Sequence, residues 1–459
     1  MKLSAAFGAS VAMALALRAL GVEEGVGWPA PVRLRVEGLE AHPGQLVVLS
    51  EPLPRFSFSH PTIAAAPRGL VGAGYRLTVR RSPAAAPAGG VVVWDSGVVR
   101  SSSSLGIVFG GSAELRAFEV YSWSAAWLAS DGQWSAEATA SFEMGPITES
   151  DWTPAAWLVG SQLRAGFRLP AAAVRARAHV AAAGCHSLEV NGERPGPDLR
   201  GVCAWTVLQK RVLYQTHDIT PLLRTGPNVV GLLSNGLDAR DGLGTPLVRA
   251  ILRVEMAGDA PPLLFRTAAN NGSEPGWMQA ESWATMAGQG NPSWLRGWQM
   301  HMNWTAEEPG WSSPGSFRPA RPWAPAASQP FAATSPAQQM PLATVVRRVA
   351  PVNATKLGWP ASNGSHVSWL YAFPRNMVGM VELTPLPGAA AGAEVVLVHG
   401  EWLEEGGSTG GAASWRPAPG RTSCPSCQAG SSRWCTRSGP TTLPRSRRCS
   451  RGMGSSTSR

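Results

Sequence analysis

Four cysteines near the carboxyl end of the chain are the residues best suited by type to bind a metal: Cys424, Cys427, Cys435 and Cys449. Four thiolates can hold zinc in a tetrahedral site. However, only the first two are closely spaced and no histidine lies near them, whereas zinc sites of this kind usually combine two close pairs of ligands. We therefore predict no metal site in this segment.

The acidic residues Glu401, Glu404 and Glu405 are concentrated at the end of an apolar segment. A pair of carboxylates can act as general acid and general base. The sequence offers no second group of acids that would face these three, so they are interpreted as a solvated strand end and turn. No catalytic residue is assigned.

Tryptophan indicates a binding site more strongly, because an indole face stacks on a sugar ring while its N–H donates a hydrogen bond. Most of the 20 tryptophans are expected in cores or packed loops. Trp205 ends a predicted loop (195–205), and polar residues that could bind hydroxyl groups or a calcium ion lie on neighbouring loops. The predicted carbohydrate-binding residues are Trp205, Asp198, Asn235, Asp238 and Asp241. Ordinary turn chemistry is the alternative interpretation of Asn235-Gly236.

The charge distribution argues against a nucleic-acid-binding surface. The formal net charge is +10, but residues 411–459 contain nine arginines and no lysine, aspartate or glutamate, which leaves +1 for the rest.

Residues 409–459 also lack Val, Ile, Phe and Tyr, so a disordered Arg/Ser/Cys-rich tail is predicted there. The chain has three lysines and 37 arginines, which indicates GC-rich codons. A frameshift near residue 408 is one hypothesis for the tail.

The amino terminus has the pattern of a secretory signal peptide, predicted over residues 1–22. Lys2 provides the positive start, and an apolar stretch too short to span a bilayer follows it. Four N-glycosylation sequons fit an exported protein: Asn271, Asn303, Asn353 and Asn363. We expect a secreted protein without a membrane-spanning segment.

The elements that must position these residues are predicted to be β-strands. Short alternating or β-branched segments separated by turns predict an all-β fold of tandem sandwiches, without a helical barrel. An Ig-like or fibronectin type III sandwich is expected at 31–147, a jelly roll at 150–330, and a partial sandwich at 338–408. Asp131-Gly132 and Asn191-Gly192 are hairpin-turn signals.

Residues 210–236 predict a corner of the second unit in detail. Thr220-Pro221 predicts a hydroxyl cap followed by one helical turn, with strands before and after it. The second strand is expected to end at the turn Asn235-Gly236. Outside the tail, Cys185 and Cys203 are the only cysteines, and both a disulfide and two free thiols fit their spacing.

Several segments, in this order, resemble the leading β-domains of bacterial-type α-L-rhamnosidases. EPLPRFSFSH (51–60) and YSWSAAWLASDGQWS (121–135) resemble that family's fibronectin-type domain. GCHSLEVNGERPG (184–196) and residues 210–236 resemble its jelly-roll domain. AEVVLVHGEWLEEGG (393–407) is similar to the opening of its next, concanavalin-like sandwich.

The resemblance implies an extracellular glycosidase that removes terminal α-L-rhamnose from glycans or glycosides. Inversion would use two carboxylates about 6.5–9.5 Å apart. In the family both come from an α/α barrel that would follow these domains, and no residue of this chain matches them. The chain as written is therefore expected to be an inactive, accessory portion, and whether it is an enzyme stays open. Some jelly rolls of the family bind rhamnose with calcium. A stand-alone secreted carbohydrate-binding protein is the alternative.

Overall fold

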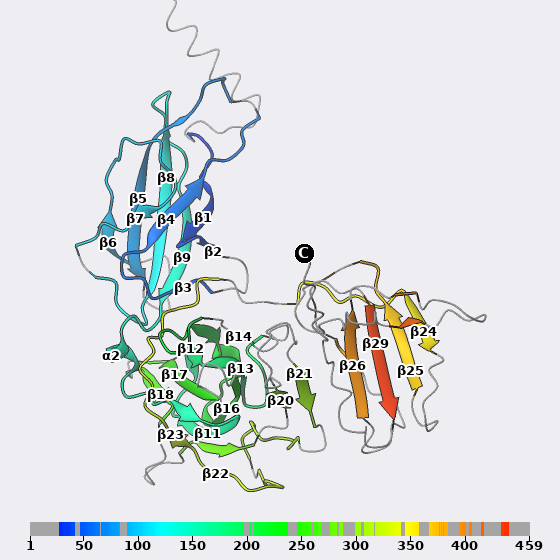
Figure 1. The fold of residues 1–459 in the computed structure, drawn as a ribbon. Helices are drawn as coiled ribbons and strands as arrows, with labels where there is room; N and C mark the ends of the chain where they lie inside the picture. The colour runs from blue at the N-terminus through cyan, green and yellow to red at the C-terminus, as the bar shows by residue number, and fades with distance from the viewer. Residues whose placement is uncertain are drawn as a thin grey trace, which may run out of the picture.

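The computed structural model contains three β-rich units (Figure 1). It describes residues 27–41, 46–64, 66–82, 90–112, 114–196, 202–203, 206–236, 246–258, 261–268, 276–281, 284–287, 299–303, 307–315, 317–340, 345–357, 367–375, 377, 379, 381–383, 394–400, 404–405, 415–416 and 433–439. The predicted signal peptide lies outside them. Over these ranges the all-β class with tandem sandwiches is confirmed, and no helix is long and apolar enough to cross a membrane.

The first unit, called the first sandwich, consists of two sheets. One has the order β2-β1-β4-β7 and the other β3-β9-β8-β5-β6, with only β3 and β9 parallel. The strands are β1 (Val32–Val36), β2 (Leu39–Glu40), β3 (Val48–Leu49), β4 (Arg55–Ser59), β5 (Gly72–Ser82), β6 (Val91–Asp95), β7 (Ile107–Val108), β8 (Val120–Ala129) and β9 (Ala138–Met144). As predicted, Asp131-Gly132 lies in the turn between β8 and β9, where Gly132 takes a positive φ of 87°.

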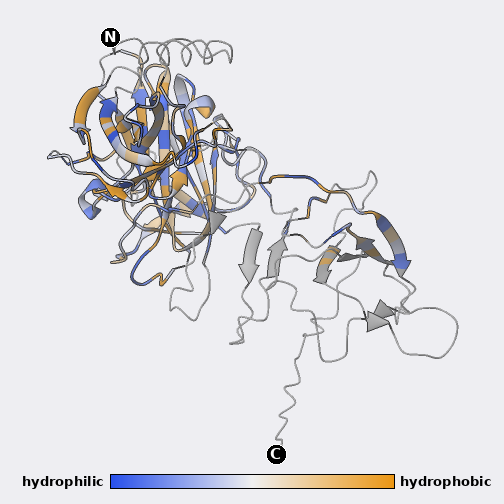
Figure 2. Cartoon of the chain, turned by 90° about the horizontal axis from the view of Figure 1, so that it is seen from above, coloured by the Kyte–Doolittle hydropathy of each residue, from blue (hydrophilic) through white to orange (hydrophobic). Residues whose placement is uncertain are grey.

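Alternation along the strands explains the core of the first sandwich, because successive side chains of a strand point to opposite faces. On β4, Phe56 and Phe58 are buried while the residues between and beside them are not. They join Trp123 and Phe142 in one aromatic cluster between the sheets. Figure 2 shows hydrophobic and hydrophilic residues interleaved along the strands.

The second unit, called the second sandwich, also has two sheets, with the orders β15-β12-β17-β10-β23 (plus β18 beside β17) and β14-β13-β16-β11-β19-β22. A short helix, α2 (Glu149–Trp152), precedes it. Its strands are β10 (Leu158–Val159), β11 (Gln162–Leu169), β12 (Ala173–Ala182), β13 (Gly184–Val190), β14 (Val202–Cys203), β15 (Tyr214–Asp218), β16 (Gly226–Gly236), β17 (Leu247–Met256), β18 (Leu263–Arg266), β19 (Met278–Ala280), β22 (Ala324–Pro325) and β23 (Ala327–Ser328). The hairpin β20 (Ala284–Ala287) and β21 (Gln299–Met302) lies between β19 and β22 in the chain.

The predicted corner forms, with two differences. The helical turn η1 spans Thr220–Leu222 and begins after Ile219, so Thr220 is its first residue rather than its cap. The Thr220 hydroxyl instead accepts the backbone N–H of Ala176 (2.8 Å), which ties the turn to β12. Strand β16 continues through Asn235-Gly236, because these residues pair with Cys185 and Gly184 of β13.

Two buried asparagines hold the corner together. Asn191 takes a left-handed φ of 55° in the predicted turn after β13, and its amide N–H donates to Asn228 Oδ1 (2.8 Å). Asn228 Nδ2 donates to the carbonyls of Arg224 (2.7 Å) and Gly226 (3.0 Å). Asparagine tolerates the left-handed region better than most residues.

The third unit contains a sheet of the order β24-β25-β29-β26. Its strands are β24 (Asn353–Leu357), β25 (Val367–Ala372), β26 (Glu394–Gly400) and β29 (Arg433–Gly439), and a further pair is formed by β27 (Glu404–Glu405) and β28 (Trp415–Arg416). β28 and β29 lie in the segment for which the sequence predicts a disordered tail. The rest of that segment lies outside the described residues.

Candidate functional site

A face of the second sandwich that carries basic side chains is buried against the first. On β12, Arg175, Arg177 and His179 alternate with Ala176 and Ala178, which point into the core of the second sandwich. A strand places alternate residues on opposite faces, so the three basic side chains share the outer face of their sheet. All three are buried there.

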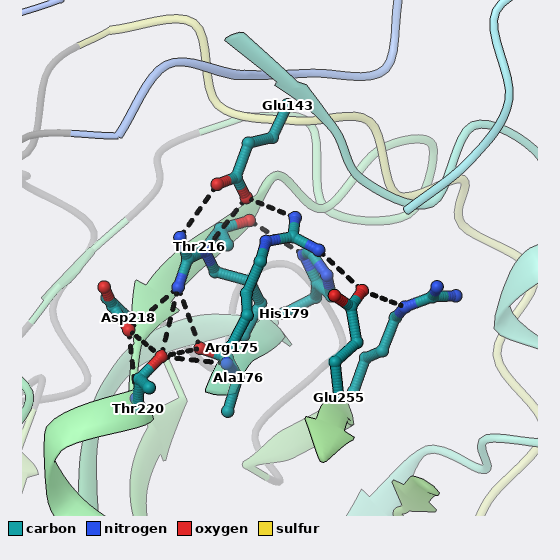
Figure 3. Close-up of polar contacts among 10 residues, drawn as sticks. Glu143, Arg175, Ala176, His179, Thr216, Asp218, Thr220 and Glu255 are labelled. Atoms are coloured by element: carbon teal, nitrogen blue, oxygen red, sulfur yellow. Dashed lines mark hydrogen bonds and ion pairs between the residues drawn. The ribbon is translucent and has the colours of Figure 1, made fainter. Parts of the chain in front are cut away.

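Glu143 of β9, at the end of the first sandwich, neutralises these arginines (Figure 3). Arg177 donates to it through two nitrogens, with Nη2 2.8 Å from Oε1 and Nε 2.9 Å from Oε2. Arg175 Nη2 donates to Oε2 at 2.9 Å. Burial alone would raise the pKa of Glu143, but the hydrogen bonds and charges of Arg177 and Arg175 outweigh it and hold that pKa below its ordinary value.

Two further carboxylates complete the cluster. Arg175 Nη1 donates to Glu255 Oε1 (2.8 Å), which also accepts Nε of Arg253 (3.2 Å). Arg177 Nη1 lies 2.8 Å from Asp218 Oδ1. Arg175 and Arg177 therefore each bridge two carboxylates, as a planar guanidinium with several donors is suited to do.

His179 lies beside this cluster in its neutral form. Its Nδ1 is 2.8 Å from the Thr216 hydroxyl, and its ring packs against Phe118 of the first sandwich and Tyr214 of β15. Burial, together with the like charges of Arg175 and the other nearby arginines, lowers the pKa of His179 to about 3.

A second set of contacts attaches helix α2 to the second sandwich. Arg249 of β17 donates through both terminal nitrogens to the Glu149 carboxylate, each at 2.8 Å. Its guanidinium carbon lies 4.4 Å from the ring centre of Trp152 and 4.8 Å from that of Trp157. The helix is therefore held by an ion pair and by one cation–π contact, and the second cation–π contact holds Trp157 in the segment between the helix and β10.

The chemistry of this interface is structural. A general acid must carry a proton and a general base must reach a substrate. Glu143 is held ionised and buried by two arginines, and Glu255 and Asp218 are also paired. A glycine shows how closely the sandwiches approach, because a Cβ at Gly145 would collide with the Tyr214 hydroxyl.

Of the predicted carbohydrate-binding residues, only Asn235 lies in the described part of the chain. It is partly buried near the end of β16 and faces Cys185 in register. Trp205, Asp198, Asp238 and Asp241 lie outside the described residues, so their grouping stays a prediction. So does a calcium ion there, and no group of three His, Cys, Asp or Glu within the described ranges could hold a metal.

The other candidates are only partly described. Asn303 and Asn353 are exposed, as glycosylation requires, whereas Asn271 and Asn363 lie outside the described residues. Glu404 and Glu405 form β27 and Cys435 lies on β29, while Glu401, Cys424, Cys427 and Cys449 are not described.

The two cysteines outside the tail face each other. Cys185 is disulfide-bonded, and Cys203 of β14 lies opposite it in the antiparallel pair of β13 and β14.

Sequence reasoning missed the interface between the sandwiches. A signal was available in VRARAHV (174–180), where three basic residues alternate with small apolar ones. Such a strand has one polar face, but nothing in the sequence shows that Glu143, more than 30 positions earlier, would cover it.

Comparisons with known proteins assign both sandwiches. Residues 31–148 match the "Rha78A-like, N-terminal immunoglobulin domain" and residues 171–348 match the "Alpha-L-rhamnosidase N-terminal domain". These are the amino-terminal domains of the α-L-rhamnosidase family. The family resemblance seen in the sequence is thereby confirmed.

Relatives support this assignment over different parts of the chain. An α-L-rhamnosidase of Formosa agariphila is 27% identical over 198 residues, which is 39% of this chain and 21% of that protein. A second one from the same organism is 23% identical over 377 residues, or 70% of this chain and 36% of that protein. An α-L-rhamnosidase of Streptomyces avermitilis is 44% identical over 71 residues, which is 15% of this chain and 7% of that protein.

Two solved α-L-rhamnosidases share the fold. That of Dictyoglumus thermophilum has a TM-score of 0.65 at 19% identity and covers 91% of this chain and 48% of its own. The Streptomyces avermitilis structure, complexed with L-rhamnose, has a TM-score of 0.64 at 18% identity. The match covers 89% of this chain and 57% of that one. The chain thus spans about half the length of these structures and about a third or less of the curated relatives.

Proposed function

We propose that this chain provides the non-catalytic, amino-terminal β-domains of an exported α-L-rhamnosidase, which removes terminal α-L-rhamnose from glycans or glycosides with inversion. The two consecutive family matches carry this proposal. In it, the first and second sandwiches are a scaffold, and the two catalytic carboxylates belong to a part of the enzyme other than these domains.

The interface between the sandwiches supports a scaffold role. Its carboxylates are bound by arginines and are unsuited to proton transfer, whereas a buried, multiply bonded ion cluster fixes the relative position of two domains. Export is supported by the amino-terminal sequence pattern and by the exposure of Asn303 and Asn353 in their sequons.

The proposal is tested by assaying the purified chain with an aryl α-L-rhamnoside. We expect no release of the aryl group above the uncatalysed rate. Release that persists after removal of contaminating glycosidases would place catalytic carboxylates in this chain and would contradict the proposal.

Calorimetric titration with L-rhamnose examines the predicted sugar platform separately. Binding that is lost in Trp205→Ala but kept in Trp134→Ala would support the predicted carbohydrate-binding site. If the chain binds rhamnose with Kd well below 1 mM and is not a portion of a larger enzyme, the alternative of a stand-alone carbohydrate-binding protein would replace the scaffold role.

A further inference from the structure

A partly buried segment of chain, residues 331–338, crosses the outer face of the second sandwich; we call it the strap. It follows β23 at one edge of the sheet and reaches β15 at the other edge. Phe331 packs edge-on against Trp157 (5.2 Å between ring centres). Ala333 and Ala337 are buried in the apolar cluster that also contains Val48 of the first sandwich. The strap is therefore packed between the two sandwiches.

At its end, the strap runs parallel to residues 211–214, which lead into β15, through two isolated β-bridges. Val212 N–H donates to the carbonyl of Thr334 (2.8 Å), and Tyr214 N–H donates to that of Pro336 (3.0 Å). In return, Gln338 N–H donates to the carbonyl of Tyr214 (2.9 Å). These bonds satisfy backbone groups that a sheet edge would otherwise leave open.

Two further N–H groups of the strap are bound by residues from outside the sheets of the second sandwich. Ala337 N–H donates to the hydroxyl of Ser50 in the first sandwich (2.8 Å), and Ser335 N–H donates to the Glu149 carboxylate of α2 (3.1 Å). Arg249, which also binds Glu149, donates to the Ser335 hydroxyl (2.7 Å). Ser335 is only 5% exposed. Such a buried N–H without an acceptor is strongly unfavourable.

Beyond the strap, most of the described residues up to β24 are solvent-exposed. Met340 is 71% exposed and Val346 is 94% exposed, before the sheet of the third unit begins with β24. Among the described residues, the strap is therefore the last firmly packed segment before that sheet.

We infer that the first sandwich has a positioning role: through Ser50, and together with Glu149 of helix α2, it clamps the strap and so sets the direction in which the chain enters the third unit. The second sandwich provides the edge on which the strap lies, and the first sandwich and helix provide the acceptors that keep it there. This role is independent of whether the domains bind sugar.

Hydrogen exchange of backbone amides tests the clamp in the full chain. Ser50→Ala removes the acceptor of Ala337 N–H, and we expect the exchange of that amide to rise about fivefold or more, with a smaller rise at Gln338. Ser57→Ala is the matched control, because Ser57 of the same sandwich accepts Gly106 N–H at 3.0 Å, away from the strap. Unchanged exchange in Ser50→Ala, or an equal rise in both variants, would overturn the inference.

Small-angle scattering tests the positional consequence. The double variant Ser50→Ala, Glu149→Ala, which removes both acceptors of the clamp, is expected to broaden the distribution of distances within the chain, whereas Ser57→Ala leaves it unchanged. If the double variant has faster exchange in the strap but an unaltered distance distribution, the strap does not set the direction of the third unit and the inference fails.

Discussion

The carboxylate of Glu143 and the guanidinium of Arg177 form a two-pronged, buried ion pair between the first and second sandwiches, with N···O distances of 2.8 and 2.9 Å. Domains joined only by a flexible linker do not require such a pair. Its burial means that neither charge can be left alone without a large cost. The two sandwiches are therefore expected to behave as one structural unit.

Glu143→Gln is predicted to lower the free energy of unfolding by about 3–5 kcal/mol, because Arg175 and Arg177 lose a buried counter-charge. Urea unfolding at pH 7 measures this change. Glu40→Gln is the control, since Glu40 pairs with Arg33, whose side chain is 61% exposed, and should change stability by about 0–1 kcal/mol. Similar effects of the two substitutions would contradict a buried interface.

Acidification is predicted to destabilise the second sandwich through three buried histidines. Burial lowers the pKa of His179 and His186 to about 3 and that of His217 to about 4, from 6.5. Because the unfolded chain binds these protons first, stability is complete above about pH 6.5 and falls as the pH falls towards 4, by up to about 1.4 kcal/mol per histidine and pH unit.

Urea unfolding at several pH values between 7 and 4.5 tests this expectation. In a variant such as His217→Gln, the free energy of unfolding should depend less steeply on pH, by the contribution of about one histidine. A free energy of unfolding that stays constant from pH 6.5 to 5 would show that these histidines are accessible to protons in the folded state.

Asn228→Ala is predicted to destabilise the corner by roughly 3 kcal/mol, since the buried side chain donates to two carbonyls and accepts from Asn191 and from Arg224 N–H. Asn353→Ala removes an exposed asparagine and should be nearly neutral. Thermal unfolding compares them. A shift in Tm as small for position 228 as for 353 would mean that the corner tolerates loss of its hydrogen bonds.

Arg249→Lys keeps the positive charge but loses the paired hydrogen bonds to Glu149 and the flat contacts with Trp152 and Trp157. A loss of about 2 kcal/mol is expected. Arg76→Lys is the matched control, because Arg76 also binds a carboxylate, Asp95, through two nitrogens but is 55% exposed. Equal stability of the two variants would argue against the docking of α2 by Arg249.

Much of the fold is predictable from local patterns in the sequence. The turns at Asp131-Gly132 and Asn191-Gly192 lie where the dipeptides indicate, because their backbone conformations favour glycine and asparagine. The helical turn after residue 219 also forms where Thr220-Pro221 predicts it. The role of Thr220 differs from the predicted helix cap, because its hydroxyl accepts the N–H of Ala176 on β12. These two residues lie 44 positions apart in the chain.

The interface and the strap are not predictable in the same way. Ser50 and Ala337 are separated by 287 positions, and no local pattern relates them. The predicted sugar-binding group rests on residue type and loop position alone. Of Trp205 and its predicted partners, only Asn235 lies in the described part of the chain. Residue type identifies candidates, but their assembly depends on long-range packing.

The central claim, that the first two sandwiches form one scaffold, is tested most directly by comparing the free energies at which their core amides exchange hydrogen in the intact chain. We predict that the slowest amides of β5 in the first sandwich and of β12 in the second exchange with the same free energy of opening. In Glu143→Gln, we predict two different free energies of opening. Clearly different values in the wild-type chain would show that the sandwiches unfold independently and would contradict the account.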